Sequence, residues 1–228
     1  MATAAAHSLD HVALWVTRRG PLTALVCDHL GMHVIERGDD FTLLGADALE
    51  GKLTLFDSEG PRQRGVLGRV VLRVGDLEAA AARLPDELGA ERRDGVVTFD
   101  APDGLRLGLA EAPGLDYDLD HVVLRVPEPE RTARDLAGLG FARRDGGLGV
   151  ADRRIVLEPG GEGGGERPLL NHLALLVDSA DEVRRDAERR GIEVEKVVDA
   201  PNTIAVFLRG PDGILIEYVE HKPGFSLT

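Results

Sequence analysis

The segment Leu119-Asp-His-Val-Val-Leu-Arg-Val126 has the length and the β-branched, leucine-rich composition of a buried strand. Three other segments align with it without gaps: Leu9-Asp-His-Val-Ala-Leu-Trp-Val16, Leu67-Gly-Arg-Val-Val-Leu-Arg-Val74 and Leu170-Asn-His-Leu-Ala-Leu-Leu-Val177. Their starts lie 58, 52 and 51 residues apart, which indicates an internal repeat. The chain is therefore expected to contain four similar units.

Each motif is followed by apolar residues at helical spacing and then by a glycine. Glycine closes a helix because it adopts the left-handed conformation without strain, and the four glycines are Gly31, Gly89, Gly140 and Gly191. The rest of each unit is rich in strand and turn residues. The turns Ala101-Pro-Asp-Gly104 and Gly210-Pro-Asp-Gly213 are expected to be hairpin turns before a last strand. Each unit thus reads as strand, helix and three strands.

Composition limits the classes of partner. The 228 residues include 27 basic and 40 acidic side chains, for a net charge of −13, which argues against nucleic acid. No apolar run approaches the length that a membrane span needs, and the start of the chain lacks a secretory signal pattern. With Cys27 as its one cysteine, the chain cannot form an internal disulfide. We therefore expect a cytoplasmic protein with neither nucleic-acid nor membrane partners.

The repeated unit, opened by Leu-Asp-His-Val and closed in the last unit by Pro-Asp-Gly-x-x-x-Glu-Tyr, resembles the vicinal oxygen chelate superfamily. This superfamily includes glyoxalase I, bleomycin-resistance proteins and extradiol dioxygenases. The resemblance implies an α/β (α+β) fold in which four βαβββ units pair into two open-barrel domains. It also implies a divalent metal on the concave face of a barrel and a small-molecule substrate. Whether the chain forms a homo-oligomer is left open.

The segment Glu111-Ala-Pro-Gly114 at the midpoint is the expected domain boundary. Pairing consecutive units gives an N-terminal domain over residues 1–114 and a C-terminal domain over residues 115–228.

In the resembling family, metal ligands come from the first and last strands of paired units. Under consecutive pairing, the N-terminal domain offers His11, Phe56, Arg69 and Gly108, and the C-terminal domain offers His121, Glu158, His172 and Glu217. Imidazole and carboxylate donate lone pairs to a metal, whereas the fixed charge of Arg69 would repel a cation. We therefore expect a metal site of His121, His172, Glu217 and Glu158 in the C-terminal domain and none in the N-terminal domain.

Two reactions fit this ligand set. Two histidines and one glutamate form the facial triad of non-haem Fe(II) oxygenases, so the leading expectation is a metal-dependent oxidoreductase similar to extradiol dioxygenases. If Glu158 instead acts as a base, the site resembles that of a glyoxalase I-like lyase or isomerase. A non-catalytic binding protein of the bleomycin-resistance type is the third alternative. Iron is the first expectation for the metal, with zinc, nickel, manganese and cobalt as alternatives.

Other residues are expected around the metal. Arg125, Arg154 and Phe207 are expected to contact the substrate, and His221 to act as a proton donor or as a support for a ligand. Phe207 stands ten residues before Glu217, where the resembling dioxygenases have a tyrosine. Their additional acid/base histidines have no counterpart near Arg154 or Val198, which indicates an altered substrate, an altered reaction or lost activity.

Overall fold

A computed structural model describes residues 6–47, 51–144, 147–161 and 167–223. The first unit contains β1 (Ser8–Val16), α1 (Arg19–His29), β2 (His33–Arg37), β3 (Phe41–Gly45) and β4 (Lys52–Asp57). The second contains β5 (Leu67–Val74), α2 (Leu77–Ala81), the short helix η1 (Asp86–Leu88), β6 (Glu91–Arg93), β7 (Val96–Asp100), η2 (Pro102–Gly104) and β8 (Arg106–Glu111).

The third unit contains β9 (Leu119–Val126), α3 (Pro129–Ala137), β10 (Ala142–Arg144), β11 (Gly147–Val150) and β12 (Arg153–Pro159). The fourth contains β13 (Leu170–Leu176), α4 (Ala180–Arg190), β14 (Val194–Asp199), β15 (Thr203–Arg209), η3 (Pro211–Gly213) and β16 (Leu215–His221). The fourfold βαβββ repeat is therefore confirmed. None of the described helices is long and apolar enough to span a membrane.

Local sequence signals explain the ends of α4. The Ser179 hydroxyl accepts a hydrogen bond from the backbone N–H of Glu182, and Gly191 closes the helix with a φ of 66°. Acidic residues occupy its first turn and basic residues its last, which suits the helix dipole. Gly31, Gly89 and Gly140 also have positive φ, so the glycine signal correctly marks the point where each helical segment stops.

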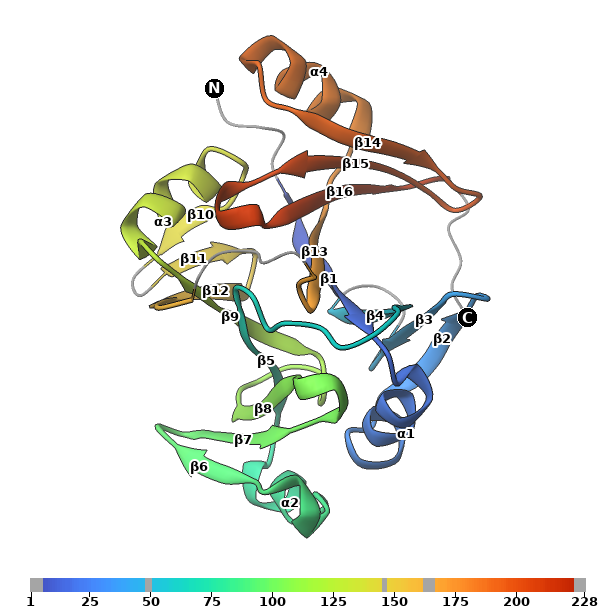
Figure 1. The fold of residues 1–228 in the computed structure, drawn as a ribbon, viewed down its shortest axis with the longest axis vertical. Helices are drawn as coiled ribbons and strands as arrows, with labels where there is room; N and C mark the ends of the chain where they lie inside the picture. The colour runs from blue at the N-terminus through green and yellow to red at the C-terminus, as the bar shows by residue number, and fades with distance from the viewer. Residues whose placement is uncertain (1–5, 48–50, 145–146, 162–166, 224–228) are drawn as a thin grey trace.

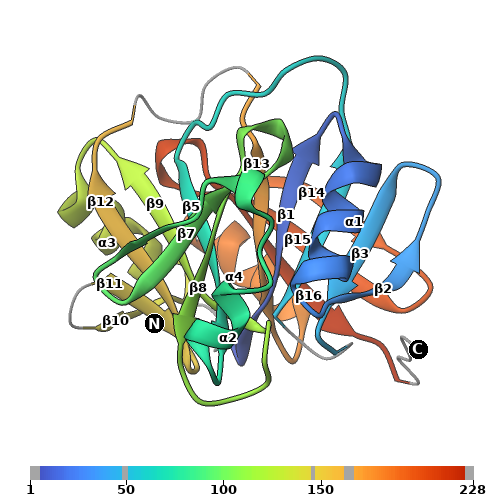
Figure 2. The same ribbon diagram turned by 90° about the horizontal axis from the view of Figure 1, so that it is seen from below.

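The strands form two eight-stranded sheets, but unit 1 does not pair with unit 2, nor unit 3 with unit 4. One sheet has the order β14-β15-β16-β13-β1-β4-β3-β2 and so joins units 1 and 4. The other has the order β10-β11-β12-β9-β5-β8-β7-β6 and joins units 2 and 3. Figure 1 shows the blue first unit beside the orange and red fourth unit, and Figure 2 shows the two sheets on opposite sides. The expected division into 1–114 and 115–228 pairs the wrong units.

The physical reason lies in the equivalence of the four motifs. The first strand of every unit can pair with the first strand of another unit. In the structure these pairs are antiparallel, β1 with β13 and β5 with β9. The motif alone does not select between partners, because the hydrogen bonds of a sheet are made by backbone groups that all four strands share. The choice depends on contacts between units that are distant in sequence.

The Pro-Asp-Gly turns link the two sheets. Asp103 and Asp212 both have positive φ, a conformation that Asp tolerates better than most residues. The Asp103 carboxylate accepts hydrogen bonds from the backbone N–H groups of Thr17 and Arg18, at 3.0 Å each, just before α1. The Asp212 carboxylate accepts from Arg131 of α3 at 2.5 Å and from the hydroxyl of Thr132. The turns of units 2 and 4 therefore dock on the helices of units 1 and 3.

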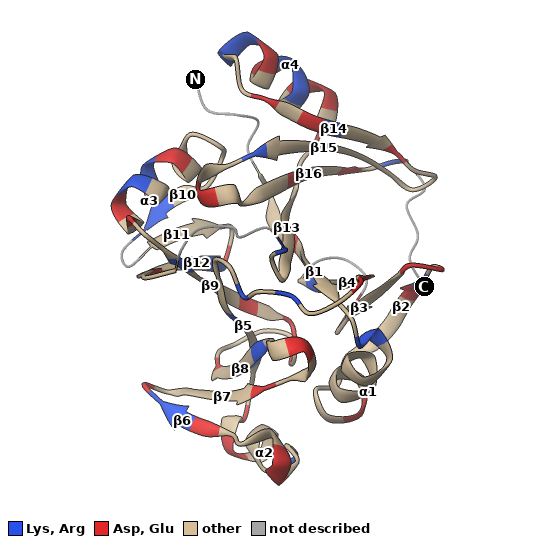
Figure 3. Ribbon diagram, viewed as in Figure 1, with Lys and Arg blue, Asp and Glu red and all other residues tan. Residues whose placement is uncertain are grey.

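Charged residues are dense on α3, on α4 and on the edge strand β6 (Figure 3). The central strands are instead buried and apolar along most of their length. Polar residues buried on β1, β13 and β16 are exceptions, and they gather at one place in the sheet of units 1 and 4.

Candidate metal centre

Three neighbouring strands bring His11, His172 and Glu217 together. The strands β1, β13 and β16 are adjacent in the sheet order. Ala174 on β13 pairs with His11 of β1 on one side and with Glu217 of β16 on the other. The small alanine side chain leaves room between the two functional groups, and His172 lies two residues away on the same face of β13.

The three potential ligand atoms converge on one point. The Nε2 atoms of His11 and His172 are 3.0 Å apart, and Oε2 of Glu217 lies 3.1 Å from the first and 2.8 Å from the second. Within the described chain, Glu217 Oε2 is buried and accepts no properly aligned hydrogen bond despite these short distances. These atoms therefore have the arrangement of ligands around a common centre.

The spacing fits a divalent metal. With bonds of about 2.1 Å, two ligands at right angles lie about 3.0 Å apart, and two ligands of a tetrahedron about 3.4 Å apart. The observed separations, between 2.8 and 3.1 Å, match three ligands on one face of an octahedron. Two imidazoles and one carboxylate suit iron, manganese, cobalt, nickel and zinc, so the donor set does not select one metal.

The other ring nitrogens are held by polar partners from the residue before each histidine. His11 Nδ1 lies 2.7 Å from Oδ2 of Asp10, and His172 Nδ1 lies 3.0 Å from Oδ1 of Asn171. The ladder between β1 and β13 is irregular at both places, skipping Asp10 and Asn171. Such bulges redirect a side chain, which explains how consecutive residues meet. Because Asp10 and Asn171 hold the Nδ1 atoms, the Nε2 atom of each histidine remains available to coordinate a metal.

A buried cation completes the surroundings of Asp10. Lys52 of β4 pairs with His11 in the sheet and places its Nζ 2.9 Å from Oδ1 of Asp10. His221, at the end of β16, places Nε2 3.5 Å from the same oxygen. Asp10 therefore links the candidate ligand His11 to both residues.

Burial and charge act in opposite directions on the site. Burial lowers the pKa of His11, but the hydrogen bond with Asp10 and the adjacent Glu217 carboxylate outweigh burial and raise this pKa to about 9. Burial raises the pKa of Glu217, yet the adjacent His172 and His11 hold it well below its usual range. Burial lowers the pKa of His172. The metal-free protein thus balances a cationic His11 against an anionic Glu217.

The sheet register identifies the fourth position of the site. Ala13 of β1 is the counterpart of Ala174, and it pairs with Thr54, so Thr54 corresponds to Glu217. The sequence alignment instead selected Phe56, which lies two residues further along β4. Thr54 is buried and offers a hydroxyl rather than a carboxylate. The site is therefore built from three strong ligands.

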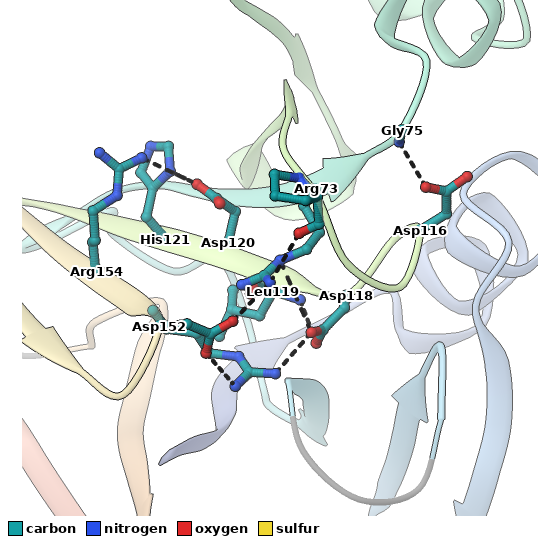
Figure 4. Close-up of polar contacts among 11 residues, drawn as sticks. Arg73, Gly75, Asp116, Asp118, Leu119, Asp120, His121, Asp152 and Arg154 are labelled. Carbon is teal, nitrogen blue, oxygen red and sulfur yellow. Dashed lines mark hydrogen bonds and ion pairs between the residues drawn. The ribbon is translucent and has the colours of Figure 1, made fainter. Parts of the chain in front are cut away.

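His121 does not join His172 and Glu217, so the expected ligand set is wrong in this respect. It lies on β9 in the other sheet, where its Nδ1 is 2.5 Å from Oδ2 of Asp120. Figure 4 shows His121 with Asp120 and Arg154, whose guanidinium donates to Asp120 at 3.3 Å. The error follows from the assumption that consecutive units pair.

Glu158 is also absent from the candidate centre. It lies on β12 in the sheet of units 2 and 3, and its Oε1 is 3.3 Å from the Arg69 guanidinium. Val156, not Glu158, occupies the position equivalent to Glu217, because it pairs with Val123. The expected roles of Glu158 as ligand and base are therefore wrong for two reasons. Glu158 lies in the other sheet, and it is two residues away from the position equivalent to Glu217.

The remaining expected residues divide between the sheets. Arg125 and Arg154 lie on β9 and β12 in the other sheet, so the structure does not bring them to the candidate centre. Phe207 lies on β15 and pairs with Glu217 of β16, and its ring lies 5.2 Å from that of His172. His221 contacts Asp10, which in turn holds the candidate ligand His11.

His11 is the functional residue whose role the sequence reasoning missed. Its signal was present, since it is the third residue of the same motif as His121 and His172. Pairing it with the unit that contains Arg69 removed it from consideration. The structure keeps Arg69 in the other sheet, where its charge does not oppose a cation beside His11.

Two open sheets of βαβββ units, with two histidines and one glutamate clustered on one of them, define the class of fold. The profile of the glyoxalase/bleomycin resistance protein/dioxygenase superfamily matches residues 66–218, and the chain belongs to this superfamily. No curated protein sequence matches the chain.

Solved structures with the same fold include a putative dioxygenase from Bacillus subtilis, with a TM-score of 0.78, 20% identity, and coverage of 97% of this chain and 87% of that one. Glyoxalase I from Zea mays aligns with a TM-score of 0.68 and 19% identity over 93% of this chain and 92% of the maize chain. The cppA protein from Streptococcus pneumoniae aligns with a TM-score of 0.64 and 14% identity, covering 92% and 97% of the two chains. At these identities the likeness concerns the fold alone.

Proposed function

We propose that this protein is a metal-dependent enzyme of the vicinal oxygen chelate type, similar to extradiol dioxygenases. In this proposal His11, His172 and Glu217 hold one divalent metal, with Fe(II) as the first candidate. The observation that carries the proposal is the convergence of their three ligand atoms within 3.1 Å of one another.

The number of ligands favours this reaction class over the alternatives. Three protein ligands leave three positions of an octahedron, enough for two vicinal oxygens of a substrate and for dioxygen. When bound, the metal would supply Lewis-acid chemistry and a site for oxygen. Thr54, in the fourth position, does not provide the second carboxylate that a glyoxalase-type base would require.

His221 is the proposed proton-transfer group. It lies on the strand that carries Glu217, four residues later, and therefore on the same face. Its ring is partly exposed and approaches Asp10 at 3.5 Å. Imidazole is the side chain most often used to accept or donate a proton in catalysis. This placement offsets the lack of histidines near Arg154 and Val198.

Metal analysis and oxygen uptake test the proposal. The wild-type chain, purified without added metal, is expected to hold iron and to consume oxygen when catechol is added. His11→Gln, His172→Gln and Glu217→Gln should each weaken metal binding by about 100-fold or more, because each removes one of three ligands. His121→Gln is the matched control from the other sheet and should retain the metal.

Three outcomes would redirect the assignment. Metal loss in His121→Gln with retention in His11→Gln would overturn the ligand set. Isomerisation of a hemithioacetal with zinc, nickel or cobalt, without oxygen uptake, would favour the glyoxalase alternative. Small-molecule binding by a chain that takes up no metal would favour a binding protein.

A further inference from the structure

Aromatic side chains are concentrated around the candidate metal centre. The chain has one tryptophan and six phenylalanines. Four of these residues lie on this sheet: Phe56 and Phe207 contact His172, and Trp15 and Phe41 contact Phe56. The Phe56 ring is 5.5 Å from Trp15, 6.0 Å from Phe41 and 6.3 Å from His172. Phe207 lies on the other side of His172, at 5.2 Å.

Three of these rings are only partly buried in the protein core. Trp15, Phe41 and Phe56 are half-buried, whereas the aliphatic side chains beneath the sheet are almost fully buried. Partly exposed aromatic faces beside polar groups are typical of sites that bind flat apolar molecules. The surface around His172 is therefore suited to a planar, apolar ligand.

Two cations flank this aromatic surface. The Nζ atom of Lys196 lies 4.2 Å from the centre of the Phe207 ring, and the Arg62 guanidinium lies 5.3 Å from that of Trp15. Within the described chain neither makes an ion pair with a carboxylate, although most other arginines do. In a protein with a net charge of −13, two positive charges therefore lie beside one aromatic surface without an ion-paired carboxylate among the described residues competing for them.

Lys196 is the cation closer to the reactive groups. Its ammonium and the His172 ring both contact Phe207, at 4.2 Å and 5.2 Å from the centre of that ring, so the two groups border the same aromatic side chain. An anionic group on a ring bound beside His172 would therefore come within reach of Lys196.

We propose that the ligand of this site is a flat aromatic carboxylate whose carboxylate pairs with Lys196. The assignment rests on the proposed function in one respect: the vicinal oxygens of the ligand are directed to the metal held by His11, His172 and Glu217. The pairing with Lys196 adds charge selectivity to the apolar contacts made by the half-buried rings of Trp15 and Phe56. A carboxylate–ammonium pair is stronger than a hydrogen bond between neutral groups, so the site discriminates an acid from its amide.

Trp15 allows a direct binding test, since it is the one tryptophan and lies in the site. Its fluorescence is followed while 3,4-dihydroxybenzoate or 3,4-dihydroxybenzamide is added to the zinc-loaded full chain. The wild type is expected to bind the acid about tenfold more tightly than the amide, and added salt should reduce this preference. Lys196→Met should remove the preference and leave the affinity for the amide unchanged.

Two further variants complete the design. Arg93→Met removes an exposed charge from β6 in the other sheet and should retain the preference for the acid. Arg62→Met tests the second cation. The proposal is overturned by equal binding of acid and amide in the wild type, by a preference that survives in Lys196→Met, or by a preference lost in Arg62→Met alone.

Metal content, measured on the same samples, separates this inference from the proposed function. If the metal is absent but the metal-free chain prefers benzoate over benzamide through Lys196, the ligand assignment holds and the metal site fails. If the metal is bound but no preference is found, the ligand assignment fails and the metal site holds.

Discussion

The ammonium of Lys52 lies 2.9 Å from Oδ1 of Asp10, and both side chains are almost completely buried. Each charge has lost its hydration, so each depends on the other and on neighbouring polar groups for compensation. Asp10 in turn holds His11 by its Nδ1. The pair therefore connects the stability of the sheet to the orientation of a candidate metal ligand.

Removing one member of this pair is expected to destabilise the protein. Lys52→Met preserves the length of the side chain but leaves the buried cluster of Asp10, His11 and Glu217 with one uncompensated negative charge, which should cost about 3–5 kcal/mol in the free energy of unfolding. Urea denaturation of the metal-free protein measures this change. Adding Asp10→Asn removes the unpaired charge and should recover part of the loss. A change below about 1 kcal/mol in the single variant would contradict this account.

The contact between Asp10 and His11 is expected to affect metal affinity. Asp10→Asn keeps the shape of the side chain but weakens its hold on the Nδ1–H group, so metal affinity should fall by about 10- to 100-fold. Asp120→Asn is the matched control, since Asp120 makes the same contact with His121 in the other sheet. Competition with a chromophoric chelator measures both variants. Equal losses in the two would refute the assignment.

Metal binding is expected to depend on pH through His11. Its pKa is about 9 in the metal-free protein, above the ordinary value of 6.5. A histidine ligand must be neutral, so metal uptake at pH 7 should release a proton. Metal affinity should rise about tenfold per pH unit from pH 7 and level off above pH 9. Calorimetry in buffers of different ionisation enthalpy counts this proton, and an affinity that is flat above pH 7 would disagree.

The same shift affects the stability of the metal-free chain. Because the pKa of His11 is higher in the folded state, its contribution to stability is complete below pH 6.5 and is lost as the pH rises through 9. His11→Gln should reduce this loss at alkaline pH, as measured by urea denaturation at pH 6 and pH 10.

Thr54 is expected to control how many positions the metal keeps open. Thr54→Glu places a carboxylate at the position equivalent to Glu217, so it should increase metal affinity and leave two open positions instead of three. Oxygen uptake with catechol should then fall by about tenfold or more, because substrate and oxygen compete for these positions. Val156→Glu, at the equivalent position of the other sheet, is the control and should leave metal affinity and oxygen uptake unchanged. A variant that keeps full activity with tighter metal binding would contradict the role of Thr54.

The repeat made the local structure predictable. The four motifs around His11, Arg69, His121 and His172 correctly located the first strand of each unit, and glycines such as Gly191 marked the ends of helical segments. These features depend on hydrophobic pattern and on backbone conformation within a few residues, both of which the sequence states directly. Two members of the site, His172 and Glu217, were found on the same basis.

The sequence by itself determined the unit, its four copies and the residue types able to bind a metal. Only the tertiary structure decided that unit 1 joins unit 4, which brings His11 to His172 and leaves His121 beside Asp120. Strand pairing uses backbone hydrogen bonds that are alike in all four copies, so the choice of partner arises from packing between segments far apart in the chain. Register, which placed Thr54 and Val156 where Phe56 and Glu158 had been expected, was likewise set by the neighbouring strand.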